Sequence, residues 1–394
     1  AQDSDDETIA RAFLAASLPE RFQADLTAFL ETIRYPLAVR SSGLLEDSLG
    51  QPFAGIYKTY MIPNNHLNLE VRLRQLCDTI KLVYASTFTR SAKLYMEATG
   101  YQVEEEKMGV ILQEIVGAQY GDHFYPTFSG VARSYNFYPL GRLKPEEGVA
   151  CVALGLGKMV VEGGEMLMFS PSHPDILPQF TDRRAMLACA QREFYALPMG
   201  RSAGHSLATA DANLVTYDLE VAERDGTLAP LGSVYSPEND ALYDGVNRPG
   251  IRVVTFAHVL KSGVFPLAEI IKLLLDIGKR GLACPLEIEF AVNLKTRPMQ
   301  FGVVQIRPTI SDQADERVSV EDVEDTRLLC HSPQTLGNGY IRNIRDVVFV
   351  KPESFDSVQT RKIAGEISRI NEKLKMAGRP SLLIGPGRWG SADP

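Results

Sequence analysis

The sequence predicts an α+β fold that is divided into more than one domain, and three observations lead to this prediction. The chain has 394 residues, which is more than an ordinary single domain contains. Apolar residues from Leu69 to Val83 recur at alternating steps of four and three, which places them on one face of a helix. Beyond Lys107, short apolar runs are separated by glycine and proline, which is typical of strands joined by turns.

The N-terminal part is predicted to be mainly helical. Residues 8–33 form two amphipathic stretches with a break near Pro19, and the apolar run at 36–39 predicts the first strand. The helix that begins at Leu69 is expected to continue, whole or broken, to Ala98. Gly100 is a plausible stop for it.

A charged group follows the first strand in the segment YPLAVRSSGLLEDS, residues 35–48. Arg40 comes directly after the apolar run and enters a turn rich in serine, with Glu46 and Asp47 just beyond. We expect these two acids to anchor the loop that follows. By itself, an arginine at a strand end is most often an ordinary surface residue, so this pattern alone assigns Arg40 no function.

The rest of the chain is predicted to consist mostly of strands. They are expected at 107–117, 128–139, 148–157, 251–260, 285–292 and 300–308, with helices at 182–196 and 266–281. Residues 200–247 are polar with weak periodicity, which predicts an irregular insertion or a domain boundary. After an acidic linker at 311–325, a small α/β segment is expected, with a strand in 345–350, a helix at about 356–375 and a further apolar run from 381.

Composition excludes several classes of protein. The formal net charge of -8 argues against binding of nucleic acid through bulk charge. No run of about 18 apolar residues is present, so no membrane span is expected. The five cysteines form no CxxC pair, which favours free thiols in a reducing cytoplasm. The N-terminus has neither the apolar region of a secretory signal nor an initiator methionine, so a fragment or a processed form is expected.

Two predicted strands near the end of the larger part carry the most chemical information. Side chains alternate between the faces of a strand, so Glu287 and Glu289 share one face of theirs. In the next strand the same alternation puts Phe301, Val303, Gln305 and Arg307 on one face. A hairpin centred on Arg297 would set Glu289 opposite Gln305 and Glu287 opposite Arg307. A slip of one residue would separate these groups.

Two carboxylates, an amide and a guanidinium on one face suit a hard cation and a polyphosphate. Magnesium binds oxygen ligands, usually one or two carboxylates together with substrate phosphates, and arginine offers a planar fork to phosphate oxygens. The simpler alternative is a cross-strand ion pair on a solvated face, worth about 0.2–1 kcal/mol. Spacing alone favours that alternative.

The segment GLGKMVVEGG, residues 155–164, is a second candidate because glycine-rich loops let backbone N–H groups approach phosphates. A Walker A motif would need glycine and a hydroxyl residue where this chain has Val152 and Met159, and a dinucleotide fingerprint would need glycine at Val160. Taken alone, the segment is more typical of a turn.

Several of these segments stand in an order that resembles one family. LAVRSSGLLEDS followed by PFAGIYKTY, then GVILQEIV, SGVARS, GLGKMVVEGG and finally LEIEFAV with VVQIRP look like the nucleotide-binding domain of the phosphoenolpyruvate synthase and pyruvate phosphate dikinase family. The resemblance covers roughly residues 35–310. It implies an ATP-grasp-type fold in which ATP lies between two α+β subdomains. The implied division is 1–105, 106–250 and a closing part at 251–312, with 326–394 as the separate C-terminal segment.

The resemblance also implies roles for individual residues and names ATP and Mg²⁺ as cofactors. Arg40 would contact the ATP phosphates, as would Arg90 in a looser alignment, while Arg307 would steady the transferring phosphoryl group. Glu289 and Gln305 would hold Mg²⁺. The implied nucleotide-binding set is Arg40, Gln113, Gly155, Gly157, Lys158, Gly163 and Glu287.

The chain departs from the family pattern in three places, which leaves two functions open. No lysine-bearing segment precedes Tyr35, and Lys158 stands where relatives have glutamate. The family passes phosphate to a histidine on a swivelling domain and then to a substrate in a barrel, but RSAGHSLATA around His205 is a poor match and the barrel is not within this chain. A phosphotransferase domain serving a pyruvate-like acceptor or a phosphohistidine domain elsewhere is one hypothesis. A non-catalytic ATP sensor is the other, and a structural protein that binds no nucleotide is a weaker third.

Overall fold

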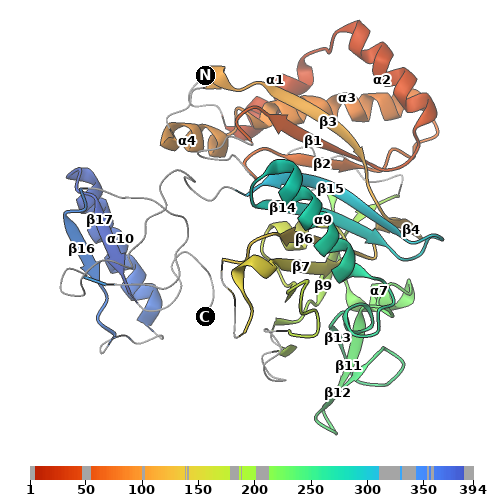
Figure 1. Ribbon diagram of the computed structural model, residues 1–394. Coiled ribbons are helices and arrows are strands. Elements are labelled where there is room, and N and C mark those ends of the chain that lie inside the picture. The colour runs from red at the N-terminus through yellow and green to blue at the C-terminus, as the bar shows by residue number, and fades with distance from the viewer. Residues whose placement is uncertain are drawn as a thin grey trace. The chain divides into compact units, whose positions relative to one another are not determined.

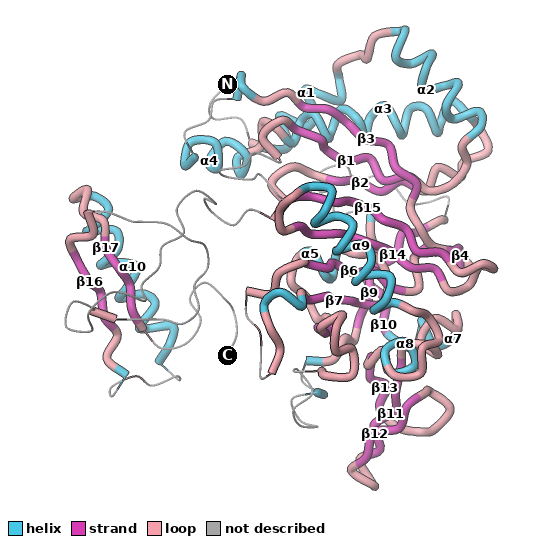
Figure 2. The backbone as a smooth tube through the Cα atoms, viewed as in Figure 1, coloured by secondary structure: helices cyan, strands magenta, loops and turns pink. Residues whose placement is uncertain are grey.

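The computed structural model describes residues 5–46, 55–99, 103–137, 139, 142–177, 186–187, 189–200, 213–309, 329–330, 343–352, 355 and 359–385. The chain separates into two compact units, Ala1–Ile310 and Ser311–Pro394. Figure 1 and Figure 2 show the elements of each unit. Gly100, Asp47, His205 and the predicted linker at 311–325 lie outside the described residues.

Four helices accompany the N-terminal part of the first unit. The predicted pair is confirmed as α1 (Asp6–Ala15) and α2 (Glu20–Thr32), with the break at Pro19 directly before α2. The longer predicted helix is present but broken into α3 (Leu69–Ser86) and α4 (Arg90–Thr99). Asn68 caps α3 by accepting a hydrogen bond from the backbone N–H of Glu70 at 2.8 Å.

A three-stranded antiparallel sheet of β2 (Thr59–Ile62), β1 (Leu37–Gly43) and β3 (Met108–Glu114) packs on α3. Leu37 and Val39 point into the core shared with this helix and are almost completely buried. The prediction that this strand ends at Val39 is wrong, because β1 pairs with β3 over its whole length to Gly43. Arg40 therefore lies within the strand, on the face opposite Val39, rather than in a turn.

A five-stranded antiparallel sheet forms the centre of the first unit. Its order is β15 (Gln300–Pro308), β14 (Leu286–Asn293), β6 (Phe128–Arg133), β7 (Val149–Leu154) and β8 (Leu167–Phe169). Helix α9 (Leu267–Leu282) covers one face (Figure 1), where its Ile271 joins the core that contains Ile288 and Phe290. The opposite face of the sheet carries the polar groups of β14.

The hairpin of β14 and β15 has the predicted register in the half that is farther from its turn. Glu287 pairs with Arg307 and Glu289 with Gln305, but the register then shifts by one residue, so that Phe290 pairs with Val303. The prediction that Phe301 and Val303 share a face with Gln305 and Arg307 is wrong. The bulge at Val304 inserts one residue and reverses the alternation, so Phe301 stacks on Phe290 with ring centroids 5.0 Å apart.

The first unit also contains a four-stranded and a second three-stranded sheet. One contains β10 (Val215–Asp218), β9 (Glu193–Pro198), β5 (His123–Tyr125) and β4 (Ala118–Tyr120), and the other β12 (Ala241–Asp244), β11 (Gly232–Ser236) and β13 (Ile251–Val254). Short helices are α5 (Lys158–Val161), α7 (Leu219–Arg224) and α8 (Ala257–Leu260).

The helix predicted for 182–196 is wrong from Glu193 onward, because Phe194 and Ala196 are buried with the two-residue period of a strand. The predicted irregular stretch contains β10, α7, β11 and β12. The strand predicted for 251–260 ends at Val254, since Phe256 adopts a left-handed conformation with φ 54° and α8 begins directly after it.

The second unit is a small α/β segment, as predicted. Strand β16 (Asp346–Phe349) runs parallel to β17 (Ser381–Ile384), and α10 (Thr360–Met376) connects them. Arg379 pairs with Asp346 through two nitrogens at 2.5 and 2.8 Å. Within the residues described for both units, every helix is too short or too polar to cross a bilayer.

Candidate functional site

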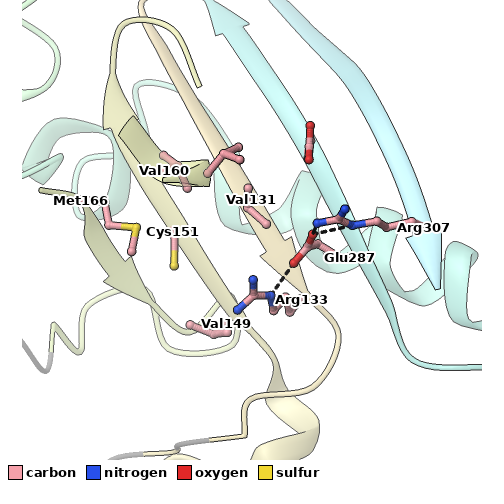
Figure 3. Close-up of a pocket in the computed structure, with 10 residues that line it drawn as sticks. Val131, Arg133, Val149, Cys151, Val160, Met166, Glu287 and Arg307 are labelled. Carbon is pink, nitrogen blue, oxygen red and sulfur yellow. Dashed lines mark hydrogen bonds and ion pairs between the residues drawn. The ribbon is translucent and has the colours of Figure 1, made fainter. Parts of the chain in front are cut away.

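A cavity of about 90 Å³ opens on the polar face of the five-stranded sheet. Its charged wall consists of Glu287, Glu289, Arg307 and Arg133, and its apolar wall is formed by Val131, Val149, Cys151, Val160, Val161 and Met166 (Figure 3). The charged residues come together because Glu287 pairs with Arg307 on one side and with Arg133 on the other. Apolar surface together with a few convergent polar groups is typical of a ligand-binding site.

Glu287 is buried and both of its carboxylate oxygens are held by arginines. Arg133 Nε lies 2.5 Å from Oε2, while Arg307 donates to Oε1 from Nε at 2.9 Å and from Nη2. Burial alone would raise the pKa of Glu287, but the charges of Arg133 and Arg307 outweigh it and lower that pKa. Glu287 is therefore ionised at neutral pH and serves the two guanidinium groups (Figure 3).

Glu289 lies two residues along β14 and lines the same cavity. Within the described part of the chain it makes no hydrogen bond or ion pair. Burial raises its pKa and outweighs the opposing charges of Arg40 and Arg307. A partly buried carboxylate that lacks a partner gains most from a cation, so Glu289 fits a metal ligand.

Arg40 joins the three-stranded sheet to the five-stranded sheet. Its Nη2 donates to Gln305 Oε1 at 2.6 Å, and its Nη1 lies 3.4 Å from Gln113 Oε1. Gln113 Nε2 in turn donates to the backbone oxygen of Val304 at 3.0 Å. Three residues that the sequence placed in one site are thus connected, although Arg40 lies 73 positions from Gln113 and 265 from Gln305.

Two carboxylates fix the end of β1 after Arg40. Glu46 accepts hydrogen bonds from Ser41 Oγ and from the backbone N–H of Gly43, both at 3.2 Å, as expected for an anchor of this loop. Glu106, which sequence reasoning missed, accepts from the backbone N–H of Leu44 at 2.6 Å and from the hydroxyl of Tyr57. Burial and the neighbouring Glu106 raise the pKa of Tyr57, so its hydroxyl remains a donor.

The glycine-rich segment supplies part of the apolar wall through Val160 and Val161 of α5. Gly155 has φ +86°, and a Cβ there would lie 2.9 Å from both Phe194 Cδ2 and Tyr195 O. Gly157 begins α5, and Gly163 follows it with φ +74° beside open space. Packing thus accounts for Gly155 and helix termination for Gly163, neither accounts for Gly157, and the expected nucleotide contact remains a prediction.

Lys158 and Arg90 are not among the residues that line the cavity. Lys158 Nζ lies 4.8 Å from the ring centroid of Tyr195 and 3.7 Å from Glu162 Oε1. Arg90 is the first residue of α4, where its backbone N–H donates to Asp6 Oδ1 at 2.8 Å and its side chain is exposed. Their predicted roles at the phosphates remain predictions.

Arg133 is the charged residue of the site that sequence reasoning missed. It lies in the quoted segment SGVARS, but its partner Glu287 follows 154 positions later, and no local pattern reveals that pairing. Cys151, on the opposite wall, was considered only as a buried free thiol. Burial raises its pKa to about 11, so the thiol is neutral and acts as an apolar wall residue.

Comparison with known proteins agrees with this geometry. The model of the family "Pyruvate phosphate dikinase, AMP/ATP-binding domain" matches residues 2–327. The uncharacterized phosphotransferase YvkC of Bacillus subtilis (strain 168) is 27% identical over 160 residues, which cover 40% of this chain and 17% of that protein. The aligned part is therefore a small fraction of that relative. Because the family model spans most of the sequence and the whole of the described site, this chain belongs to the pyruvate phosphate dikinase AMP/ATP-binding domain family.

Proposed function

We propose that the first unit binds ATP with Mg²⁺ and transfers a phosphoryl group from it, as a dikinase-type phosphotransferase domain. The observation that carries this proposal is that Glu289 and Arg307 line one cavity, while Gln305, which pairs with Glu289 across the hairpin, accepts a hydrogen bond from Arg40 of β1. Phosphoryl transfer depends mainly on positioning and on stabilisation of negative charge, which is what guanidinium groups around a metal site provide. The nucleotide would lie between the three-stranded and five-stranded sheets, in an ATP-grasp-type arrangement.

The magnesium ion would be held by Glu289 and Gln305. Gln305 Oε1 accepts from Arg40, but a carbonyl oxygen has two lone pairs and retains one for a metal. Among the described residues there is no group of three or more histidine, cysteine, aspartate or glutamate side chains that could enclose a metal. The remaining ligands would be phosphate oxygens and water, which is usual for Mg²⁺. When bound, the ion would neutralise charge on the phosphate oxygens.

Arg40 and Arg307 have separate tasks in this proposal. Arg40 contacts the phosphates from the three-stranded sheet, next to Gln113, which lies beside the nucleotide. Arg307 steadies the transferring phosphoryl group, and Glu287 fixes its orientation through two hydrogen bonds. The acceptor would be a pyruvate-like small molecule or a phosphohistidine domain elsewhere.

A non-catalytic nucleotide sensor is the second candidate, and the replacement of the family's glutamate by Lys158 favours it. Relatives carry glutamate there, whereas this lysine is largely buried against Tyr195 and turned toward Glu162. Such a protein would bind ATP but would not turn it over.

A titration with ATP, with and without Mg²⁺, combined with analysis for AMP, ADP, phosphate and pyrophosphate, tests both candidates. Mg²⁺-dependent binding with product formation is expected for the phosphotransferase, and binding without products would favour the sensor. Arg307→Ala should abolish turnover without unfolding the protein, because Glu287 keeps Arg133 as a partner. Undiminished turnover in that variant would contradict the role given to Arg307, and absence of ATP binding to the wild-type protein would contradict both candidates.

A further inference from the structure

We propose that Arg133 is a further phosphate-binding residue, which contacts the terminal phosphoryl group of ATP from the side opposite Arg307, and that Glu287 is the positioning residue that holds both arginines. This inference rests on the proposed function and adds to its site a residue from β6, a strand that supplied none of the predicted site residues.

The pairing of strands places the two arginines symmetrically. Glu287 in β14 is directly opposite Arg307 in β15 and directly opposite Arg133 in β6. Neighbouring strands lie about 4.8 Å apart, so the two arginine backbones are separated by roughly 10 Å. Both side chains lean inward to the same carboxylate, and Figure 3 shows them approaching Glu287 from opposite sides. Their guanidinium groups therefore border one cavity from two strands.

Arg133 retains donors that the ion pair does not use. Its contact with Glu287 is made through Nε, and no other described side chain pairs with its two Nη groups. The side chain is 50% exposed, whereas that of Glu287 is 7% exposed. A guanidinium has five N–H donors in a planar fork. Arg133 can therefore keep its bond to Glu287 and still donate to an anion in the cavity.

The charges around Glu287 also favour an anion. One carboxylate is shared by two guanidinium groups, which leaves this group of three side chains with a net charge of about +1, and the charge of the neighbouring Glu289 would be neutralised by the Mg²⁺ of the proposed function. A terminal phosphoryl group carries negative charge on three oxygens, and two guanidinium groups on opposite sides can donate to different oxygens at once.

Binding of ATP and ADP to the full chain and to Arg133→Gln separates this role from a structural one. The β,γ-imido analogue of ATP replaces ATP in the titration with Mg²⁺, so that turnover does not interfere. Loss of a charge-assisted contact to the terminal phosphate should weaken binding of the analogue about tenfold or more, with ADP binding unchanged. Arg133→Lys should recover part of this loss, because it keeps the charge but not the fork.

Arg252→Gln is the matched control, because Arg252 forms a two-bond pair with Glu223 at 2.6 and 2.9 Å and does not line the cavity. This control should bind both nucleotides as the wild type does. If Arg133→Gln fails to fold in a thermal-unfolding measurement, Arg133→Lys carries the comparison. Equal affinities in wild type and variant, or equal weakening for analogue and ADP, would overturn the inference alone. A wild-type protein that binds neither nucleotide would overturn the proposed function and this inference together.

Discussion

The partly buried carboxylate of Glu289 has opposite effects on stability and on the proposed metal site. Its pKa in the folded protein is raised above the ordinary value of 4.5, mainly by burial. A carboxyl with a raised pKa stabilises the fold fully below its unfolded pKa, and this contribution is lost as the pH rises through the folded pKa. At neutral pH the ionised Glu289 therefore destabilises the protein when no cation is bound.

Glu289→Gln is expected to raise the melting temperature of the ligand-free protein at pH 7.5 by about 1–3 °C and to abolish Mg²⁺-dependent nucleotide binding. The gain should shrink as the pH falls and should vanish near pH 4.5, the ordinary value for the carboxyl. Thermal unfolding from pH 4.5 to 8, with and without Mg²⁺, measures both effects. A stability difference that does not depend on pH would contradict the assigned cause.

Gly155 and Gly163 offer a matched test of why the segment is rich in glycine. Both have positive φ, but a Cβ at Gly155 meets Phe194 and Tyr195 whereas a Cβ at Gly163 meets open space. Gly163→Ala should cost about 1–2 kcal/mol for the left-handed conformation, and Gly155→Ala should cost about 1–3 kcal/mol more for overpacking. Urea unfolding of both variants measures the difference. Equal losses would mean that the close approach of β9 is not what requires glycine at position 155.

At the scale of elements, α9 shows how one helix divides its residues between core and solvent. Ile271 is 1% exposed and Leu273 is 58% exposed. Ile271→Ala should lower the free energy of unfolding by about 2–5 kcal/mol, whereas Leu273→Ala should change it by less than about 0.5 kcal/mol. Denaturant titrations of the two variants provide the comparison. A large loss in Leu273→Ala would reveal that this face is covered in the protein in solution.

Elements whose pairing is local could be predicted from the sequence, and those with distant partners could not. The link between β14 and β15 is short, so alternation alone gave the correct pairing of Glu287 with Arg307. The bulge at Val304 was missed although Gly302 stands two residues before it, because a glycine within a strand does not give the position of a bulge. β1 extends to Gly43 because it pairs with β3, about 70 positions away.

The same limit applies to the candidate site. Arg40, Gln113 and Gln305 were grouped by the resemblance to the family, and the contacts among them come from different sheets. Arg133 was missed because its role depends on the pairing of β6 with β14. These contacts depend on which strands pair in the folded protein, and the order of residues along the chain contains little information about the pairing of distant strands.

At the scale of the whole molecule, the described buried core residues all belong to the first unit, between Leu30 and Val292. If Mg²⁺ and ATP bind across the sheets that Arg40 connects, amide hydrogen exchange should slow in β1, β3 and β15. Exchange in α10 of the second unit should not change, which provides an internal control. At a nucleotide concentration 100 times the dissociation constant, stabilisation of about 2.7 kcal/mol is expected. Uniform slowing in both units would contradict a site confined to the first.

The bulge at Val304 separates two sets of evolutionary constraints within a single strand. Residues before it contribute side chains to the hydrophobic core, as Phe301 does, whereas after it Arg307 lines the cavity and Gln305 bonds Arg40. Substitutions in the first half can therefore adjust packing without displacing the site, and substitutions in the second half can alter ligand preference without opening the core. Deletion of Val304 should preserve this division, because Val303 would remain opposite Phe290 and Gln305 opposite Glu289 in a regular ladder, with Phe301 on the core face and Gln305 and Arg307 on the other face.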